Sequence, residues 1–168
     1  RALYSSEDIH AVMQALEFLN ANEQLLPHKK ILVDGLLSFD KKEELIPLLW
    51  KKLSEFHPRM QVNLLDYIRY ASSNWKDEML SMLETSQDRE IQIACVRYFG
   101  RYQDERSVSF LLHHAKEEKE GVWELQNACI SALAMYPGPQ TLEILKKEIS
   151  SKNWYVRHNA AKSLAVLN

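Results

Sequence analysis

Apolar residues recur at helical spacing along this chain, and one twelve-residue pattern of them returns four times. It reads MQVNLLDYIRYA from Met60, IQIACVRYFGRY from Ile91, LQNACISALAMY from Leu125 and VRHNAAKSLAVL from Val156, and the first of these copies is the faintest. The starts are 31, 34 and 31 residues apart, within the range of about 20 to 50 residues that is typical of stacked structural repeats. The pattern therefore predicts a repeat architecture.

A second amphipathic helix is predicted before each copy, so that one repeat is a pair of helices. Strand signals are missing, because the chain has only four glycines and no sustained alternation of apolar and polar residues. One further helix pair is predicted before the pair that contains the Met60 copy. The chain is therefore predicted to have an all-α fold of five pairs. The predicted pairs span residues 5–39, 40–72, 74–102, 104–136 and 138–167.

The first, fifth and ninth positions of the repeated pattern are expected to form the buried side of each second helix. In the third and fourth copies these positions include Leu133 and Ala160, and in the second copy they include Phe99. Cys95 and Cys129 both occupy the fifth position, in consecutive repeats. Because neighbouring helices pack about 8–10 Å apart, whereas a disulfide needs Cα atoms within about 7 Å, both cysteines are predicted to be free thiols.

The segment NWYVRHNAAKSLAVL, residues 153–167, resembles the second helix of a bacterial HEAT repeat, with its Val-Arg pair, small residues and following Leu. The resemblance extends over most of the chain and is strongest from Asp88 onward. It implies a HEAT-like, armadillo-type α-α superhelix, that is, a right-handed solenoid of about five helix pairs in a single domain, 1–168. It also implies that the first helices form the convex face and the second helices the concave one.

One position departs from this resemblance. HEAT repeats often carry an arginine after the valine, as Arg157 does here, but the matching residues of the other copies are Gln61, Gln92 and Gln126. A glutamine side chain has both donors and an acceptor and no charge. We expect a ladder of neutral hydrogen bonds between adjacent repeats, and the alternative is that these glutamines are solvated.

The outward positions of the second helices are the candidate binding residues. If the matched apolar positions point inward, the helices expose Asp66, Asn127 and a set of mostly basic residues, with Tyr70, Tyr98 and Tyr102 among them. Such a basic and aromatic surface suits an acidic peptide or an anion, and the alternative is an ordinary solvated face with the tyrosines in the core. The candidate concave-face residues are Arg69, Arg97, Arg101, Ser131, His158 and Lys162.

The tryptophans at matching repeat positions, Trp123 and Trp154, are expected to pack in the loop between paired helices. Trp50 and Trp75 lie in or at the start of first helices and are expected to be half exposed. None of the four forms an obvious stacking platform in the sequence.

Composition and charge narrow the function classes. A net charge of -2 gives no strong nucleic-acid signal, and no run of about 18 apolar residues predicts a membrane span. Because the chain opens on Arg1 and stops directly after an apolar helix, it is expected to be a piece of a longer protein. A cytoplasmic location is expected, including the cytoplasmic part of a membrane-anchored parent protein.

Catalytic motifs are absent from the sequence. His113 and His114 are adjacent and point in different directions, so they cannot share a metal as an i, i+4 pair could. There is no phosphate-binding glycine loop, nucleophile elbow or C-x-x-C. We predict a non-catalytic scaffold, without cofactor or metal, that binds a protein or peptide on its concave face. The alternative is a HEAT-like enzyme or nucleic-acid-binding module, resembling DNA glycosylases or phycobilin lyases.

Overall fold

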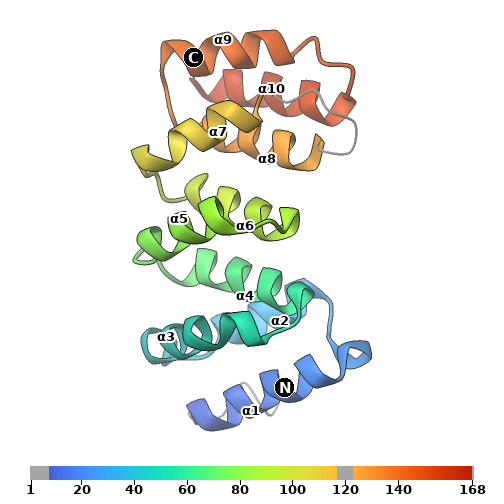
Figure 1. Cartoon of the computed structure of the whole chain (residues 1–168), viewed down its shortest axis with the longest axis vertical. Coiled ribbons are helices and arrows are strands. Elements are labelled where there is room, and N and C mark those ends of the chain that lie inside the picture. The colour runs from blue at the N-terminus through green and yellow to red at the C-terminus, as the bar shows by residue number, and fades with distance from the viewer. Residues whose placement is uncertain (1–7, 117–122, 168) are drawn as a thin grey trace. The chain divides into compact units, whose positions relative to one another are not determined.

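The computed structural model describes residues 8–116 and 123–167, and all the regular structure in these two ranges is helical. Ten α-helices follow one another in these ranges, which confirms the all-α prediction (Figure 1). Two of them fall within the bounds of each predicted pair, and the division of the chain into five pairs stays a prediction. The chain forms two compact units, Arg1–Ser72 and Ser73–Asn168. The division falls between the second and third predicted pairs, and the expected single domain stays a prediction.

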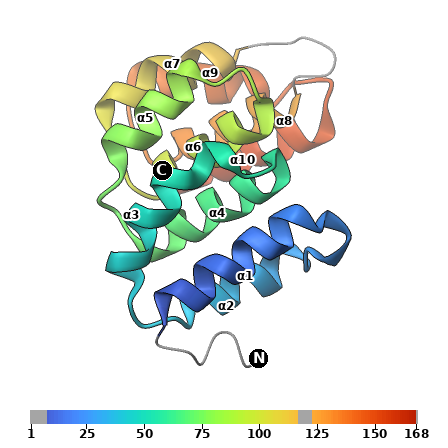
Figure 2. The ribbon, with the colours of Figure 1, turned by 60° about the horizontal axis from the view of Figure 1, so that its bottom comes forward.

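Residues 8–72 of the first unit form four α-helices and two short 3-10 helices (Figure 2, blue to green). Helix α4 packs along α2, and α3 contacts both α1 and α4. The elements are α1 (Ile9–Ala21), η2 (Glu23–Leu25), α2 (Lys29–Leu37), α3 (Lys42–Lys52), η3 (Leu53–Glu55) and α4 (Pro58–Ala71).

The second unit has six α-helices and one 3-10 helix within residues 73–116 and 123–167. Helix α5 packs on α6, α7 on α8 and α9 on α10, while α8 also lies against both α6 and α10 (Figure 1). The second helices of the three pairs are therefore consecutive neighbours. The elements are α5 (Lys76–Thr85), α6 (Arg89–Phe99), η4 (Glu105–Ser107), α7 (Val108–His114), α8 (Trp123–Leu133), α9 (Pro139–Glu148) and α10 (Trp154–Leu167).

The repeated apolar positions form the core, as predicted. Phe99, Leu133 and Ala160 are fully buried, and so are both cysteines. Leu164 is only partly covered, because it lies on the last helix. Cys95 and Cys129 are free thiols, which confirms that prediction. Burial raises the pKa of the Cys95 thiol to about 12, so it stays protonated at neutral pH.

Helix starts are fixed by local polar side chains. Asp88 Oδ1 accepts hydrogen bonds from the backbone N–H groups of Glu90 (2.8 Å) and Ile91 (3.2 Å), and so begins α6. Asn153 Oδ1 begins α10 in the same way, through Tyr155 N at 2.9 Å. The chain thus enters both second helices through the same type of cap.

The glutamine row does not form the expected ladder. In every copy the side chain at the second position of the repeat donates instead to a carbonyl at the end of the preceding helix of its own pair, which satisfies an acceptor that the helix leaves unpaired. Gln126 also reaches the next pair, where its Nε2 donates to Glu148 Oε2 at 3.2 Å. The bonds are Gln61 Nε2 to Phe56 O (2.6 Å), Gln92 Nε2 to Ser86 O (2.9 Å), Gln126 Nε2 to Ala115 O (3.2 Å) and Arg157 NH1 to Ser151 O (2.7 Å).

Candidate functional site

The second helices of the second unit leave matching ridges outside the core. Each ridge consists of residues four apart, which share one side of a helix, and continues into the turn that follows α6 and α8. We call the three ridges together the second-helix face. Its residues are Arg89, Ile93, Arg97 and Arg101 on α6, Trp123, Asn127, Ser131 and Met135 on α8, and Trp154, His158, Lys162 and Val166 on α10; all but the buried Ile93 are exposed or partly exposed.

Contacts between neighbouring helices show that the ridges lie side by side. Asn159 Nδ2 donates to Asn127 Oδ1 at 2.8 Å, and one turn further along Ser163 Oγ donates to Ile130 O at 3.1 Å. These pairs occupy nearly the same positions in their repeats, so α8 and α10 run in the same direction with similar positions adjacent.

Helix α6 approaches α8 in the same register. A Cβ at Gly100 would lie 3.3 Å from both Cα and Cβ of Ala132, which is tighter than ordinary van der Waals contact. Glycine therefore permits close approach of the two backbones. The repeat positions of Gly100 and Ala132 differ by two, so the ridges of α6 and α8 are also neighbours.

The second-helix face carries positive charge and no carboxylate. Arg97, Arg101 and Lys162 are exposed, and none of the twelve ridge residues is an aspartate or glutamate. Among the residues that the structure describes, no carboxylate pairs with Arg97 or Lys162. Arg101 Nε donates to Tyr102 Oη at 3.2 Å, with its guanidinium 5.5 Å from the centre of that ring. The face is thus open to anionic groups.

Five of the six residues predicted for the binding surface are exposed on this face: Arg97, Arg101, Ser131, His158 and Lys162. Tyr98, expected to lie among them, is fully buried. Its Oη accepts a hydrogen bond from Trp75 N at 3.0 Å, and burial raises its pKa to about 12. Tyr98 is therefore a packing residue, and the prediction that it forms part of the surface is wrong.

Arg69 and Asp66 lie in the first unit and differ from the prediction. Asp66, expected to be exposed, is only 1% exposed and pairs with Lys29 Nζ of α2. Arg69 NH2 lies 2.9 Å from Asp66 Oδ1, and the Arg69 side chain is only 18% exposed. Its guanidinium also stacks 4.3 Å from the centre of the Tyr70 ring. Arg69 therefore neutralises a buried carboxylate within its own unit.

Four rings gather where α8 and α10 begin, and we call Trp123, Trp154, Tyr155 and His158 the aromatic cluster. Trp123 stacks on Tyr155 with ring centres 5.1 Å apart, and Trp154 stacks on His158 at 5.1 Å. Trp154 and Tyr155 meet edge to face, a favourable aromatic geometry. Trp154 is 59% exposed, so the prediction that it packs in the loop is wrong. The i, i+4 spacing of Trp154 and His158 was the signal in the sequence.

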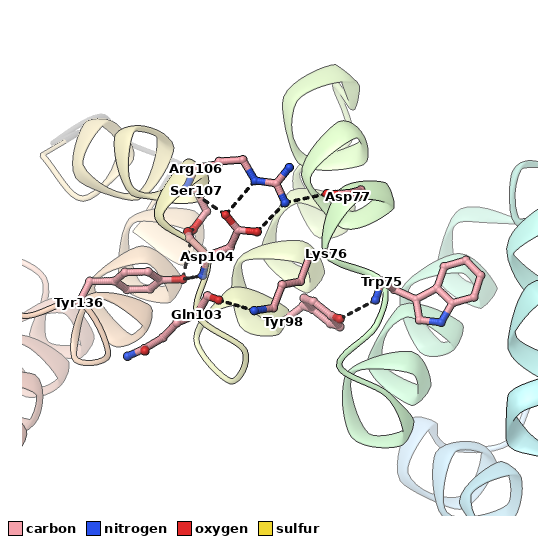
Figure 3. A network of polar contacts seen from close by, with 9 residues as sticks. All are labelled: Trp75, Lys76, Asp77, Tyr98, Gln103, Asp104, Arg106, Ser107 and Tyr136. Atoms are coloured by element: carbon pink, nitrogen blue, oxygen red, sulfur yellow. Dashed lines mark hydrogen bonds and ion pairs between the residues drawn. The ribbon is translucent and has the colours of Figure 1, made fainter.

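A polar network joins the pairs α5/α6 and α7/α8 (Figure 3). Arg106 NH2 lies 2.7 Å from Asp77 Oδ1 on α5 and 2.6 Å from Asp104 Oδ2 at the start of η4. The hydrogen bond from Arg106 lowers the pKa of the Asp104 carboxyl. Tyr136 Oη accepts from Asp104 N at 3.1 Å, donates to Phe99 O at 3.0 Å and lies 3.2 Å from Ser107 Oγ.

The same junction is closed by two more contacts. Lys76 Nζ donates to Gln103 O at 2.6 Å (Figure 3). Gln103 Nε2 in turn donates to Met135 O. Two backbone groups between α6 and η4 thus have partners in different pairs: Gln103 O bonds to Lys76 of α5, and Asp104 N bonds to Tyr136, which follows α8. These hydrogen bonds and ion pairs hold α5/α6 against α7/α8. Their role is therefore structural.

In residues 8–116 and 123–167, no three His, Cys, Asp or Glu side chains are grouped closely enough to hold a metal ion. The rings of His113 and His114 are nearly perpendicular, 4.8 Å between centres. No helix of the described ranges has the length and apolar character needed to cross a bilayer.

No protein-family model, curated protein or solved structure matches the chain. Function therefore has to be inferred from the residues themselves.

Proposed function

We propose that this chain is a non-catalytic HEAT-like scaffold that binds an acidic peptide segment of a partner protein on the second-helix face. The observation that carries the proposal is the exposure of Arg97 and Lys162 on ridges without carboxylates, with no carboxylate partner for either among the described residues. Arginine forms paired hydrogen bonds with carboxylates, and lysine adds a point charge.

The HEAT-like part of the proposal is supported by the repeated construction of the pairs. Five helix pairs follow one another, and the residue after the first core position caps the preceding helix in four of them. Pairs of this kind that stack in series would form a solenoid, whose second helices would line a concave, right-handed superhelical surface. Two buried free thiols fit the reducing cytoplasm, where we place the chain.

Charge reversal tests the proposal. Arg97→Glu combined with Lys162→Glu is expected to weaken binding of a fluorescein-labelled, glutamate-rich peptide at least about tenfold, because juxtaposed like charges oppose association. Fluorescence anisotropy gives the Kd, and the affinity of the unaltered protein should fall as salt is added.

The matched control is Lys146→Glu, which reverses an exposed lysine on the first helix α9. It should leave the Kd of the glutamate-rich peptide unchanged. Equal weakening by Lys146→Glu, or undiminished binding by the double variant, would show that the second-helix face is not the binding surface.

A single-stranded nucleic acid is the second candidate, favoured by exposed rings beside the cations, since bases stack on aromatic side chains. The overall charge of -2 favours the peptide instead. Tighter binding of a labelled oligonucleotide than of the glutamate-rich peptide, with steep salt dependence, would select the nucleic-acid function.

A further inference from the structure

We infer that the partner segment carries one large apolar side chain, held by the aromatic cluster, at a fixed distance from the acidic residues that face Lys162 and Arg97. This inference rests on the proposed function and specifies the partner of the same face. It defines a two-part recognition element, with an apolar anchor at the start of α10 and anion contacts further along the ridges.

The aromatic cluster has the composition of a contact site rather than of a core. Trp154 is 59% exposed and Tyr155 is 54% exposed, although their rings already hold one another through stacking and edge contacts. Rings fixed in this way lose little conformational freedom on binding, which is why tryptophan and tyrosine are frequent among residues that dominate interface energetics.

Nearby charge decides what kind of side chain the cluster receives. Lys162 lies two helical turns beyond Trp154 on the same ridge, and Arg157 and His158 lie three and four residues after Trp154. A cationic ligand on the rings would be repelled by Arg157, which lies on the turn next to Trp154. An apolar side chain avoids that repulsion, and the acidic residues of the same segment can contact Lys162 and Arg97.

Helix geometry sets the spacing between the two parts. Trp154 and Lys162 are eight residues apart, which is about 12 Å along α10. An extended peptide covers this distance with about four residues at about 3.3 Å each. Arg97 lies two helices away, about 18 Å across and about 12 Å along the axis, so about seven extended residues reach it on an oblique path. That path passes to one side of Lys162, and a glutamate at about the fourth residue meets Lys162 through the length of the two side chains.

Synthetic peptides of about fifteen residues, the length that spans this face in either direction, provide the probe. The first has phenylalanine at its centre and glutamates about four and seven residues away on both sides, so that either chain direction matches the spacing. The second has alanine in place of the phenylalanine. The third keeps the composition of the first but places all the glutamates next to the phenylalanine.

The protein is expected to bind the first peptide about tenfold or more tightly than either of the others, as burial of one large apolar side chain would give. Trp154→Ala should reduce this advantage to less than about threefold. Tyr155→Ala, a second variant of the aromatic cluster, should reduce it independently, and circular dichroism checks that both variants are folded. Phe18→Ala removes an equally exposed ring from the first unit and should leave the advantage intact.

Equal affinity for the first two peptides, or for the first and third, would overturn the inference, and so would an advantage that persists in both cluster variants. If binding in that case still depends on Arg97 and Lys162, the proposed function stands alone. Failure of all three peptides to bind would overturn both.

Discussion

Leu133→Ala is expected to lower the free energy of unfolding by about 2–5 kcal/mol, the range for truncation of a fully buried leucine. Leu133 is fully buried at the ninth position of its repeat, on the side of α8 that lies inside the second unit. The truncation removes apolar contacts and leaves a cavity that the surrounding helices cannot close completely. Urea titration followed by circular dichroism measures the loss.

Leu164 is the matched control, because it occupies the same repeat position on the last helix but is only partly buried. Leu164→Ala should therefore cost clearly less than Leu133→Ala, about 1 kcal/mol, since the transfer term scales with the area removed from water. A loss below about 0.5 kcal/mol for Leu133→Ala, or equal losses at the two positions, would contradict the register of the repeats.

Tyr136→Phe is expected to lower the free energy of unfolding by about 1–3 kcal/mol, the cost of leaving buried polar groups unsatisfied. The Tyr136 hydroxyl bonds to Asp104 N, Phe99 O and Ser107 Oγ. Phenylalanine keeps the shape of the ring but removes all three bonds at the junction between the pairs α5/α6 and α7/α8. The same urea titration measures the change.

Tyr155→Phe serves as the control for the loss of a hydroxyl alone. Tyr155 is 54% exposed and takes part in ring contacts, which phenylalanine preserves. Its substitution should change the free energy of unfolding by no more than about 0.5 kcal/mol. The junction would not depend on the Tyr136 hydroxyl if the two variants were equally stable.

The all-helical fold was predictable from the sequence because apolar residues recur at helical spacing in every segment. Phe99, Leu133 and Ala160 follow the repeat and are buried as their positions require. The free thiols were predictable for the same reason, since Cys95 and Cys129 share one core position of consecutive repeats. Both features depend only on the spacing of residues along the chain, which can be read directly from one sequence.

Contacts that depend on particular partners were not predictable. Asp66 has the repeat position of the exposed Arg97, yet Lys29 of α2 and Arg69 draw it into a buried ion pair. Gln92 was expected to reach the neighbouring repeat, whereas a free carbonyl, Ser86 O, lies nearer at the end of α5. In both cases the nearest complementary group determined the bonding partner. The spacing of residues along the chain does not show which group that is.

The aromatic cluster was missed for a related reason. A tryptophan next to a loop packs inward in many helical pairs, which is what the repeat positions of Trp123 and Trp154 suggested. In this chain the rings of Tyr155 and His158 offer contacts on the outside of α10. Trp154 can therefore stay exposed while retaining aromatic neighbours.

Spin-label distances across the second-helix face test the central claim most directly, namely that α6, α8 and α10 place equivalent residues side by side. Labels would be attached in pairs to cysteines at positions 97, 131 and 162, after Cys95 and Cys129 are replaced by alanine, the residue at the matching position 160. With about 8–10 Å between neighbouring helix axes, the distance from 97 to 162 should be about twice that from 131 to 162, near 20 Å. A distance from 97 to 162 equal to or shorter than that from 131 to 162 would contradict the account.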